Sequence, residues 1–268
     1  TPGGATVTTA ASATTATISG LTNGTSYTFT VHATNAIGNS TDSTPSNPVT
    51  PTATTSSISF VQVAGSAFRN NSGGISTTLV PSITDGDFLL SVLGDAKGSR
   101  VNWSTPAGWP STPDVDVASG SISTDMRAVI DHRTAAQDGG ATYTWSNSPF
   151  TYLSLGVLDY SGVDTANPFD GTATSDTDTT TAPGLTTDVN GCTLVYVLVV
   201  SGQANTVTNA PTGFTQRFTI SSTGGSTDPH IYVFDATQTT AGATGPISAT
   251  ISGSSSRAVA VVFALRPA

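Results

Sequence analysis

The stretch Asp85-Gly86-Asp87-Phe88-Leu89-Leu90-Ser91-Val92-Leu93 has a counterpart 105 residues later, Asn190-Gly191-Cys192-Thr193-Leu194-Val195-Tyr196-Val197-Leu198. In both stretches a glycine precedes a run that is mainly apolar. A short apolar run that follows a turn signal is typical of a buried β-strand. The recurrence predicts that two similar β-structures follow one another along the chain.

The same spacing relates other positions between residues 86 and 160 to positions in the second half of the chain. It places Pro106, Gly108 and Trp109 on Pro211, Gly213 and Phe214, and Val157 and Leu158 on Val262 and Phe263. A spacing of 104 also aligns Val129 with Val233 and Asp131 with Asp235. We interpret the pattern as an internal duplication with halves of about 58–162 and 163–268.

A period of this length is too long for a solenoid repeat. Two arrangements fit it: one large, jelly-roll-like β-sandwich made of both halves, or two small sandwiches in tandem. The only candidate separator between the halves is the Thr- and Asp-rich stretch 171–181. We therefore favour one large sandwich over residues 58–268.

The composition predicts an all-β protein. The chain has no Glu, all seventeen acidic residues are Asp, and Lys97 is the only lysine. Glu and Lys commonly fill exposed helix faces, whereas Thr and Val suit strands and Gly, Asn and Asp suit turns. Strands are expected at 58–64, 87–93, 126–132, 142–146, 153–160, 193–200, 214–220, 230–235, 247–251 and 257–265.

The N-terminal residues form a separate unit. An Asn23-Gly24 turn precedes Tyr27, and apolar and polar residues then alternate as far as Ala33, as in a half-buried strand. With Leu21 six residues before Tyr27, this part resembles the C-terminal half of a fibronectin type III module, in which such a pair forms the tyrosine corner. We assign residues 1–51 to this module and 52–57 to a polar linker. The resemblance implies that the module's first strands lie upstream of residue 1 or come from another chain.

Charge and cysteine content exclude several classes of function. The net charge is −9, and the seven arginines form no cluster, which argues against nucleic-acid binding. The lone Cys192 lies in an apolar run and is expected to be a buried free thiol. No apolar stretch is long enough for a transmembrane helix, so no membrane insertion is expected.

The sequence indicates no enzyme and no cofactor. It contains no Gly-x-Ser-x-Gly motif, and His32, His132 and His230 fall in separate strands or strand edges. A glycosidase pair would have to consist of two Asp residues. The pairs Asp85–Asp87 and Asp114–Asp116 are interpreted as turn and strand-edge residues.

Two candidate binding sites remain. Asp176 and Asp178 could supply oxygen ligands to calcium, although no EF-hand or nonapeptide pattern accompanies them. Exposed tryptophan faces stack on sugar rings. In the duplication Trp109 aligns with another aromatic residue, which indicates packing, whereas Trp103 aligns with Thr208. Trp103 is therefore the candidate carbohydrate-binding residue.

Residues 58–267 resemble a domain of minor tail and fibre proteins of tailed bacteriophages. The resemblance rests on Asp85–Leu90, Thr105–Trp109, Leu158–Asp164 and Ala264–Pro267. It implies a non-enzymatic virion protein on the outside of the particle, in contact with other virion proteins or further copies of itself, and adhering weakly to host-surface glycans. The alternative is a secreted bacterial surface module that binds polysaccharide beside a catalytic or adhesive domain.

Overall fold

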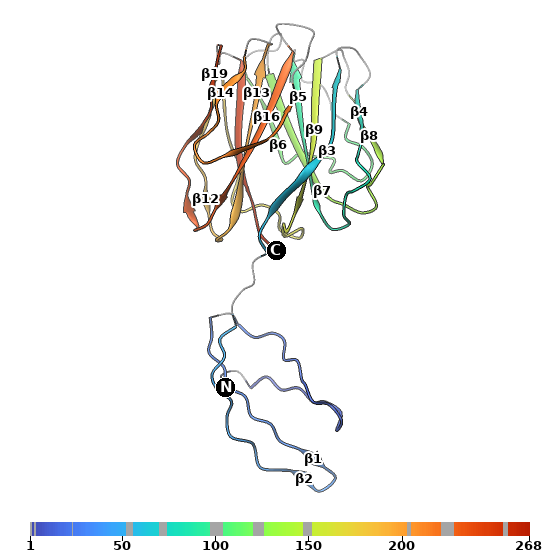
Figure 1. The fold of residues 1–268 in the computed structure, drawn as a ribbon, viewed down its shortest axis with the longest axis vertical. Helices are drawn as coiled ribbons and strands as arrows, with labels where there is room; N and C mark the ends of the chain where they lie inside the picture. The colour runs from blue at the N-terminus through green and yellow to red at the C-terminus, as the bar shows by residue number, and fades with distance from the viewer. Residues whose placement is uncertain are drawn as a thin grey trace. The chain divides into compact units, whose positions relative to one another are not determined.

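The computed structural model describes residues 2, 4–22, 24–51, 56–69, 74–96, 104–119, 126–146, 152–202, 205–220, 228–253 and 257–268. The chain divides into two compact units, Thr1–Thr55 and Ser56–Ala268 (Figure 1). The described secondary structure of both units consists of β-strands, as the composition predicts. No helix in the described part of the chain is long and apolar enough to cross a membrane.

The N-terminal unit contains an irregular hairpin in which serines replace part of the strand ladder. Ser40 donates its backbone N–H to the Ala33 carbonyl (2.8 Å), and its hydroxyl accepts the Ala33 N–H (3.0 Å). Ser43 pairs with Val31, and Ser46 with Phe29, in the same way. Successive paired residues are thus three apart on the serine side of the hairpin and two apart on the other side. Among the described residues of this unit, the strand ladder is formed by β1 (Thr34–Asn35) and β2 (Gly38–Asn39).

Tyr27 anchors this unit. It is 8% exposed and pairs with Val49, and its hydroxyl accepts the Thr22 N–H at 3.0 Å. This bond from the tyrosine hydroxyl to the backbone a few residues upstream is the predicted tyrosine corner. Among the apolar side chains of the unit, Val31 and Ile37 are largely exposed.

The C-terminal unit is built on two five-stranded antiparallel sheets. The first has the order β3 (Ser59–Arg69), β9 (Tyr152–Ser161), β5 (Phe88–Ala96), β7 (Met126–Thr134) and β6 (Val115–Ala118). The second has the order β10 (Thr174–Thr177), β20 (Ala258–Leu265), β13 (Cys192–Ser201), β16 (Pro229–Gln238) and β15 (Thr215–Ile220). Each predicted strand range in this unit contains a strand, and each sheet takes all of its strands from one half.

The long strands are apolar on both faces because both faces are covered. In β5, Leu90 and Val92 point into a core that lies between the two sheets, whereas Leu89 and Leu93 point to the outer face. The inner core combines residues of both halves, and each outer face has a cluster of its own. An antiparallel sheet with one face in water would alternate apolar and polar residues. The continuous apolar runs therefore reflect a structure with four layers.

Short strand pairs form the two outer layers. The first sheet is covered by β4 (Ile75–Thr78) with β8 (Thr142–Trp145). The second is covered by three pairs: β11 (Thr181–Ala182) with β18 (Ile247–Ser248), β12 (Thr186–Thr187) with β17 (Gly242–Ala243), and β14 (Val207–Asn209) with β19 (Thr250–Ile251). Figure 1 shows β4 and β8 on one side of the sandwich and β14 and β19 on the other.

The strand pairing confirms the internal duplication. Replacing β3, β9, β5, β7 and β6 by β10, β20, β13, β16 and β15 converts the order of one sheet into that of the other. Turns correspond as well: the backbone N–H of Trp109 donates to the Pro106 carbonyl (3.1 Å), and the backbone N–H of Phe214 donates to the Pro211 carbonyl (3.0 Å). Gly108 and Gly213, which precede the two aromatics, both have positive φ, 86° and 82°.

The predicted alignment of β7 with β16 is wrong by one residue. Val92 pairs with Ile130, and its counterpart Val197 pairs with Val233, so the spacing is 103 at this strand. Both Ile130 and Val233 belong to the inner core, whereas Val129 belongs to the outer cluster. A shift of one residue moves every side chain of a strand to the other face. The identities at a spacing of 104 are therefore accidental.

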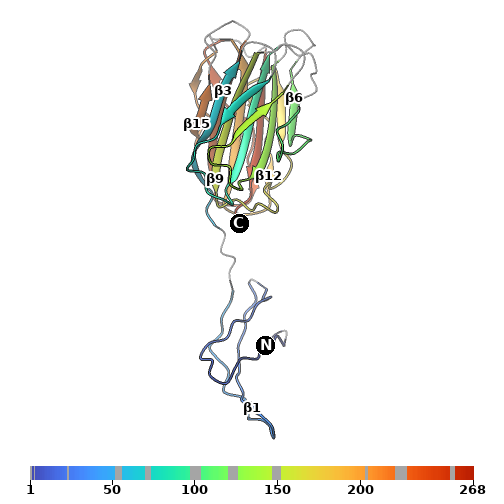
Figure 2. The same cartoon turned by 90° about the vertical axis from the view of Figure 1, so that its right-hand side faces the viewer.

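The two sheets face each other about an approximate two-fold axis. β3 lies against β15 at one edge and β6 against β10 at the other, and the duplication converts the first pair into the second. Figure 2 shows β3 and β15 at one side of the sandwich and β6 at the other. Because the inner core is shared, the halves form one sandwich and not two in tandem. The likeness to a jelly roll is limited to the packing of two sheets. In the described residues, each five-stranded sheet takes its strands from one half, so the chain does not alternate between the two sheets.

A contact between the halves makes this shared core testable. A Cβ atom at Gly156 on β9 would lie 2.4 Å from Cε1 of Phe218 on β15. Gly156→Ala is therefore expected to lower the free energy of unfolding by about 1–3 kcal/mol, as measured by denaturant titration. Adding Phe218→Leu should restore part of the loss. An unchanged midpoint in the single variant would mean that the halves do not share this core.

Candidate functional site

A groove of about 250 Å³ opens between the edge strands β6 and β10. Residues 114–117 line one wall and residues 172–175 line the other. The two strands are terminal members of opposite sheets, so the groove lies where the sandwich is open at its side. Val115 and Val117 contact the inner core at this edge.

The carboxylates on the β6 wall are held by basic side chains of β7. Asp114 Oδ2 lies 2.6 Å from Nδ1 of His132, whose ring stacks on Phe88 with centroids 5.1 Å apart. Both oxygens of Asp116 accept hydrogen bonds from the guanidinium of Arg127. The interpretation of this pair as strand-edge residues is confirmed. The wall presents fixed carboxylates that still have oxygen lone pairs available.

The predicted carbohydrate-binding residue, Trp103, lies outside the described residues. Trp109 is 6% exposed and packs edge-to-face on Trp145, with ring centroids 5.2 Å apart. Tyr143 also contacts both rings, and its hydroxyl donates to Asp138. The packing role predicted for Trp109 is confirmed, and Tyr143 and Trp145 belong to the same aromatic cluster.

The two predicted calcium ligands lie in and just after β10. Asp176 and Asp178 are exposed, and Asp176 Oδ1 accepts the Thr177 N–H at 2.8 Å. Asp178 has a positive φ of 58°. The described part of the chain contains no group of three or more His, Cys, Asp or Glu residues placed to hold a metal. The stretch taken as a separator between halves is thus, in part, an edge strand.

A second polar feature lies beneath the outer layer of the first sheet. Asp131 and Ser91 are cross-strand neighbours on β7 and β5, and each is 1% exposed. Asp131 Oδ1 and the Ser91 hydroxyl have no hydrogen-bond partner among the described residues. Burial raises the pKa of Asp131 to about 7, and the negative charges of Asp114 and Asp116 act in the same direction, while His132 opposes them. Sequence reasoning missed this residue because it aligned Asp131 with Asp235.

Asp235 lies in a different environment, between the sheets. Its Oδ1 accepts a hydrogen bond from Nε of Arg217 at 2.8 Å, and its Oδ2 accepts one from the Tyr160 hydroxyl at 3.3 Å. The Arg217 guanidinium also lies 5.2 Å from the ring centroid of Phe60. Because Tyr160 and Phe60 belong to the first half, this cluster joins the halves at the edge opposite the groove.

Cys192 is a buried free thiol, as its apolar run predicts. Its Sγ lies 3.2 Å from Oδ2 of Asp170. Burial raises the pKa of this thiol to about 12, and the hydrogen bond to the carboxylate contributes in the same direction. The protonated thiol is thus a packing group rather than a nucleophile.

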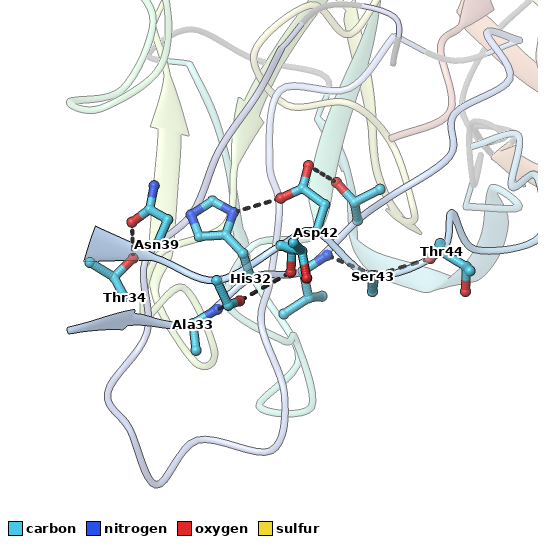
Figure 3. A network of polar contacts seen from close by, with 11 residues as sticks. His32, Ala33, Thr34, Asn39, Asp42, Ser43 and Thr44 are labelled. Atoms are coloured by element: carbon cyan, nitrogen blue, oxygen red, sulfur yellow. Dashed lines mark hydrogen bonds and ion pairs between the residues drawn. The ribbon is translucent and has the colours of Figure 1, made fainter. Parts of the chain in front are cut away.

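The N-terminal unit carries a surface network around His32 (Figure 3). Nδ1 of His32 lies 3.1 Å from Oδ1 of Asp42, whose other oxygen accepts from Thr30. The His32 side chain is 42% exposed, so it faces outward as its alternation predicts. The network joins the two sides of the hairpin and contains no Ser–His contact.

Comparison with known proteins assigns the N-terminal unit. Residues 1–51 match the family model of the fibronectin type III domain. The predicted module is therefore confirmed, and such modules are common in extracellular and adhesion proteins. No curated protein and no solved structure matches the chain. The resemblance of residues 58–267 to phage tail proteins thus has no matched relative behind it.

The buried carboxyl group of Asp131 predicts a pH dependence of stability. Its pKa is near 7 in the folded state and near 4 in the unfolded state. Between these values the folded state holds a proton that the unfolded state has lost, so the free energy of unfolding falls as pH rises from 4 to 7. Asp131→Asn should remove this contribution and become more stable than the wild type, by at least about 1 kcal/mol at pH 8.

Denaturant titrations from pH 4 to 8 measure the difference between the two proteins. The raised pKa values of Asp87, Asp159 and Asp235 affect both proteins and cancel in the difference. Asp176→Asn, which removes an exposed carboxylate, is the matched control and should follow the wild type. A constant difference between Asp131→Asn and the wild type across this range would contradict the assignment.

Proposed function

We propose that this chain is a non-enzymatic structural and adhesive module that works outside the cell, on the exterior of a virion. The observation that carries the extracellular part is the fibronectin type III match over residues 1–51. Such modules commonly stand beside domains that bind surfaces, and a stable sandwich follows this one.

Several polar groups of the sandwich support a non-enzymatic role because they have structural partners. His132 is held by Asp114 and Phe88, and Asp235 joins the two sheets through Arg217 and Tyr160. Arg133 lies over the rings of Trp109 and Tyr143 and pairs with Asp138. These contacts stabilise layers of the sandwich, which is the use expected in a scaffold.

The virion placement is the finer part of the proposal. It rests on the short motifs around Gly86, Gly108 and Tyr160, which resemble those of phage tail and fibre proteins. In this role the sandwich would be present in several copies and would make weak contacts with host-surface glycans. Multiple copies turn weak single contacts into stable attachment. The acidic surface, with a net charge of −9, is consistent with a protein that stays soluble and does not bind nucleic acid.

Immunogold electron microscopy tests the placement. Antibodies raised against residues 56–268 should label the outside of intact particles purified from the source on a density gradient. The same antibodies blocked with the purified protein are the control. Label on intact bacterial cells and none on particles would contradict the virion role and leave a secreted surface module. Label only after lysis would contradict both.

A further inference from the structure

The groove between β6 and β10 has a counterpart at the other edge of the sandwich, and that counterpart is closed. There β15 lies against β3 and β9, and Phe218 packs so tightly on Gly156 that no Cβ atom would fit between them. Arg217 closes the same edge by lying over Phe60 and bonding to Asp235. Since an approximate two-fold axis relates the edges, the open one is a departure from the symmetry of the fold.

The residues that meet at the two edges differ at equivalent positions. Phe218 pairs with Val233, and Val115 pairs with Ile130, which is the counterpart of Val233. Val115 on β6 is therefore the equivalent of Phe218 on β15, and both contact the inner core. The Phe218 ring lies on Gly156, and the counterpart of Gly156 in the second half is the larger Val261. The closed edge thus combines phenylalanine with glycine, whereas the open edge has valine at both equivalent positions.

The lining of the groove combines an apolar floor with polar walls. Val115, Val117 and Ala173 provide methyl groups. Asp114 and Asp116 present carboxylate oxygens already fixed by His132 and Arg127, and Thr172 and Ser175 add hydroxyls on the opposite wall. Hydroxyls both donate and accept hydrogen bonds, whereas carboxylates only accept them. A matching ligand has several hydroxyl or amide donors beside a patch of C–H groups.

We propose that this groove binds one neutral sugar unit of a surface glycan. The volume of about 250 Å³ is slightly below the range of about 300–1,000 Å³ found for drug-sized ligands, so it suits a single ring. The two carboxylates and the net negative charge disfavour an anionic sugar. The inference deepens the adhesive part of the proposed function and rests on it.

The test uses the residue found at the closed edge. Val115→Phe should fill the groove from the β6 wall, because Val261 takes the inner position that glycine holds at the closed edge. Ser175→Leu should narrow the groove from the other wall and remove a hydroxyl. Val61→Phe makes the same change at a residue of edge strand β3 that is 46% exposed, and serves as the matched control. Circular dichroism and thermal unfolding identify the variants that fold. If Val115→Phe does not fold, the binding of Ser175→Leu decides the test.

The readout is binding of the biotinylated full chain, held on tetravalent streptavidin, to printed glycans. The array contains glycans that end in glucose, galactose, mannose or N-acetylglucosamine, together with glycans that end in glucuronic or sialic acid. We expect the wild type and Val61→Phe to bind at least one neutral glycan, and the groove variants to bind it at least about tenfold more weakly.

The outcomes separate the groove from the adhesive function. If the groove variants bind as the wild type does, adhesion stands and the groove is not its site. A preference for the anionic glycans that the groove variants lose would overturn the neutral-sugar assignment. If the wild type binds none of the glycans, both the groove and the adhesive role fall, and a purely structural module remains.

Discussion

Both faces of two apolar sheets have to be kept from water, and the rest of the sandwich follows from this requirement. In β5 and β13 consecutive residues are buried on opposite faces, so covering one face is not enough. Burying a Val or Leu side chain stabilises by about 1.5–3 kcal/mol, and a half by itself would expose the inner residues Leu90 and Val92. The other half is the cover that the duplication provides, while short strand pairs and turns cover the outer faces. An interface of two similar sheets closes naturally about a two-fold axis, because the same residues then meet from both sides.

Much of this arrangement could be predicted from the sequence, because strands that are buried on both faces have apolar runs, and these runs recur at a fixed spacing in the two halves. The spacing of 105 holds in β5, β9, β13 and β20, the central strands whose two faces are both apolar. It fails at β7, where chance identities favoured 104, and only the hydrogen-bonded register gives 103. Strand β10 was hidden for another reason. It is an edge strand of Thr, Ser and Asp, and its polar composition is the same as that of a loop.

The groove was beyond sequence reasoning for a physical reason. It exists because β6 and β10, which are members of opposite sheets, meet at one edge, and their sequences do not determine that meeting. The difference between Val115 and Phe218 becomes informative only after the register identifies them as equivalents. Asp131 presents the same difficulty, since it stands in the strand sequence Val129-Ile130-Asp131-His132 where a surface carboxylate would look identical. The sequence does show that Val129 and Asp131 lie on the same face of their strand. A carboxylate on that face is unusual only if the face is buried, and the sequence does not show that short strands cover it.

The halves differ in two places, the open groove beside β6 and the buried Asp131 on β7. These two places are adjacent. Where the second half packs Tyr196 against Phe234, the first half has Ser91 and Asp131, and the indoles of Trp109 and Trp145 occupy the layer above them. The carboxylates that raise the pKa of Asp131, Asp114 and Asp116, are also the ones that line the groove. The first half thus has a cavity and a titrating group on two sides of one strand, β6, whereas the corresponding edge of the second half is filled.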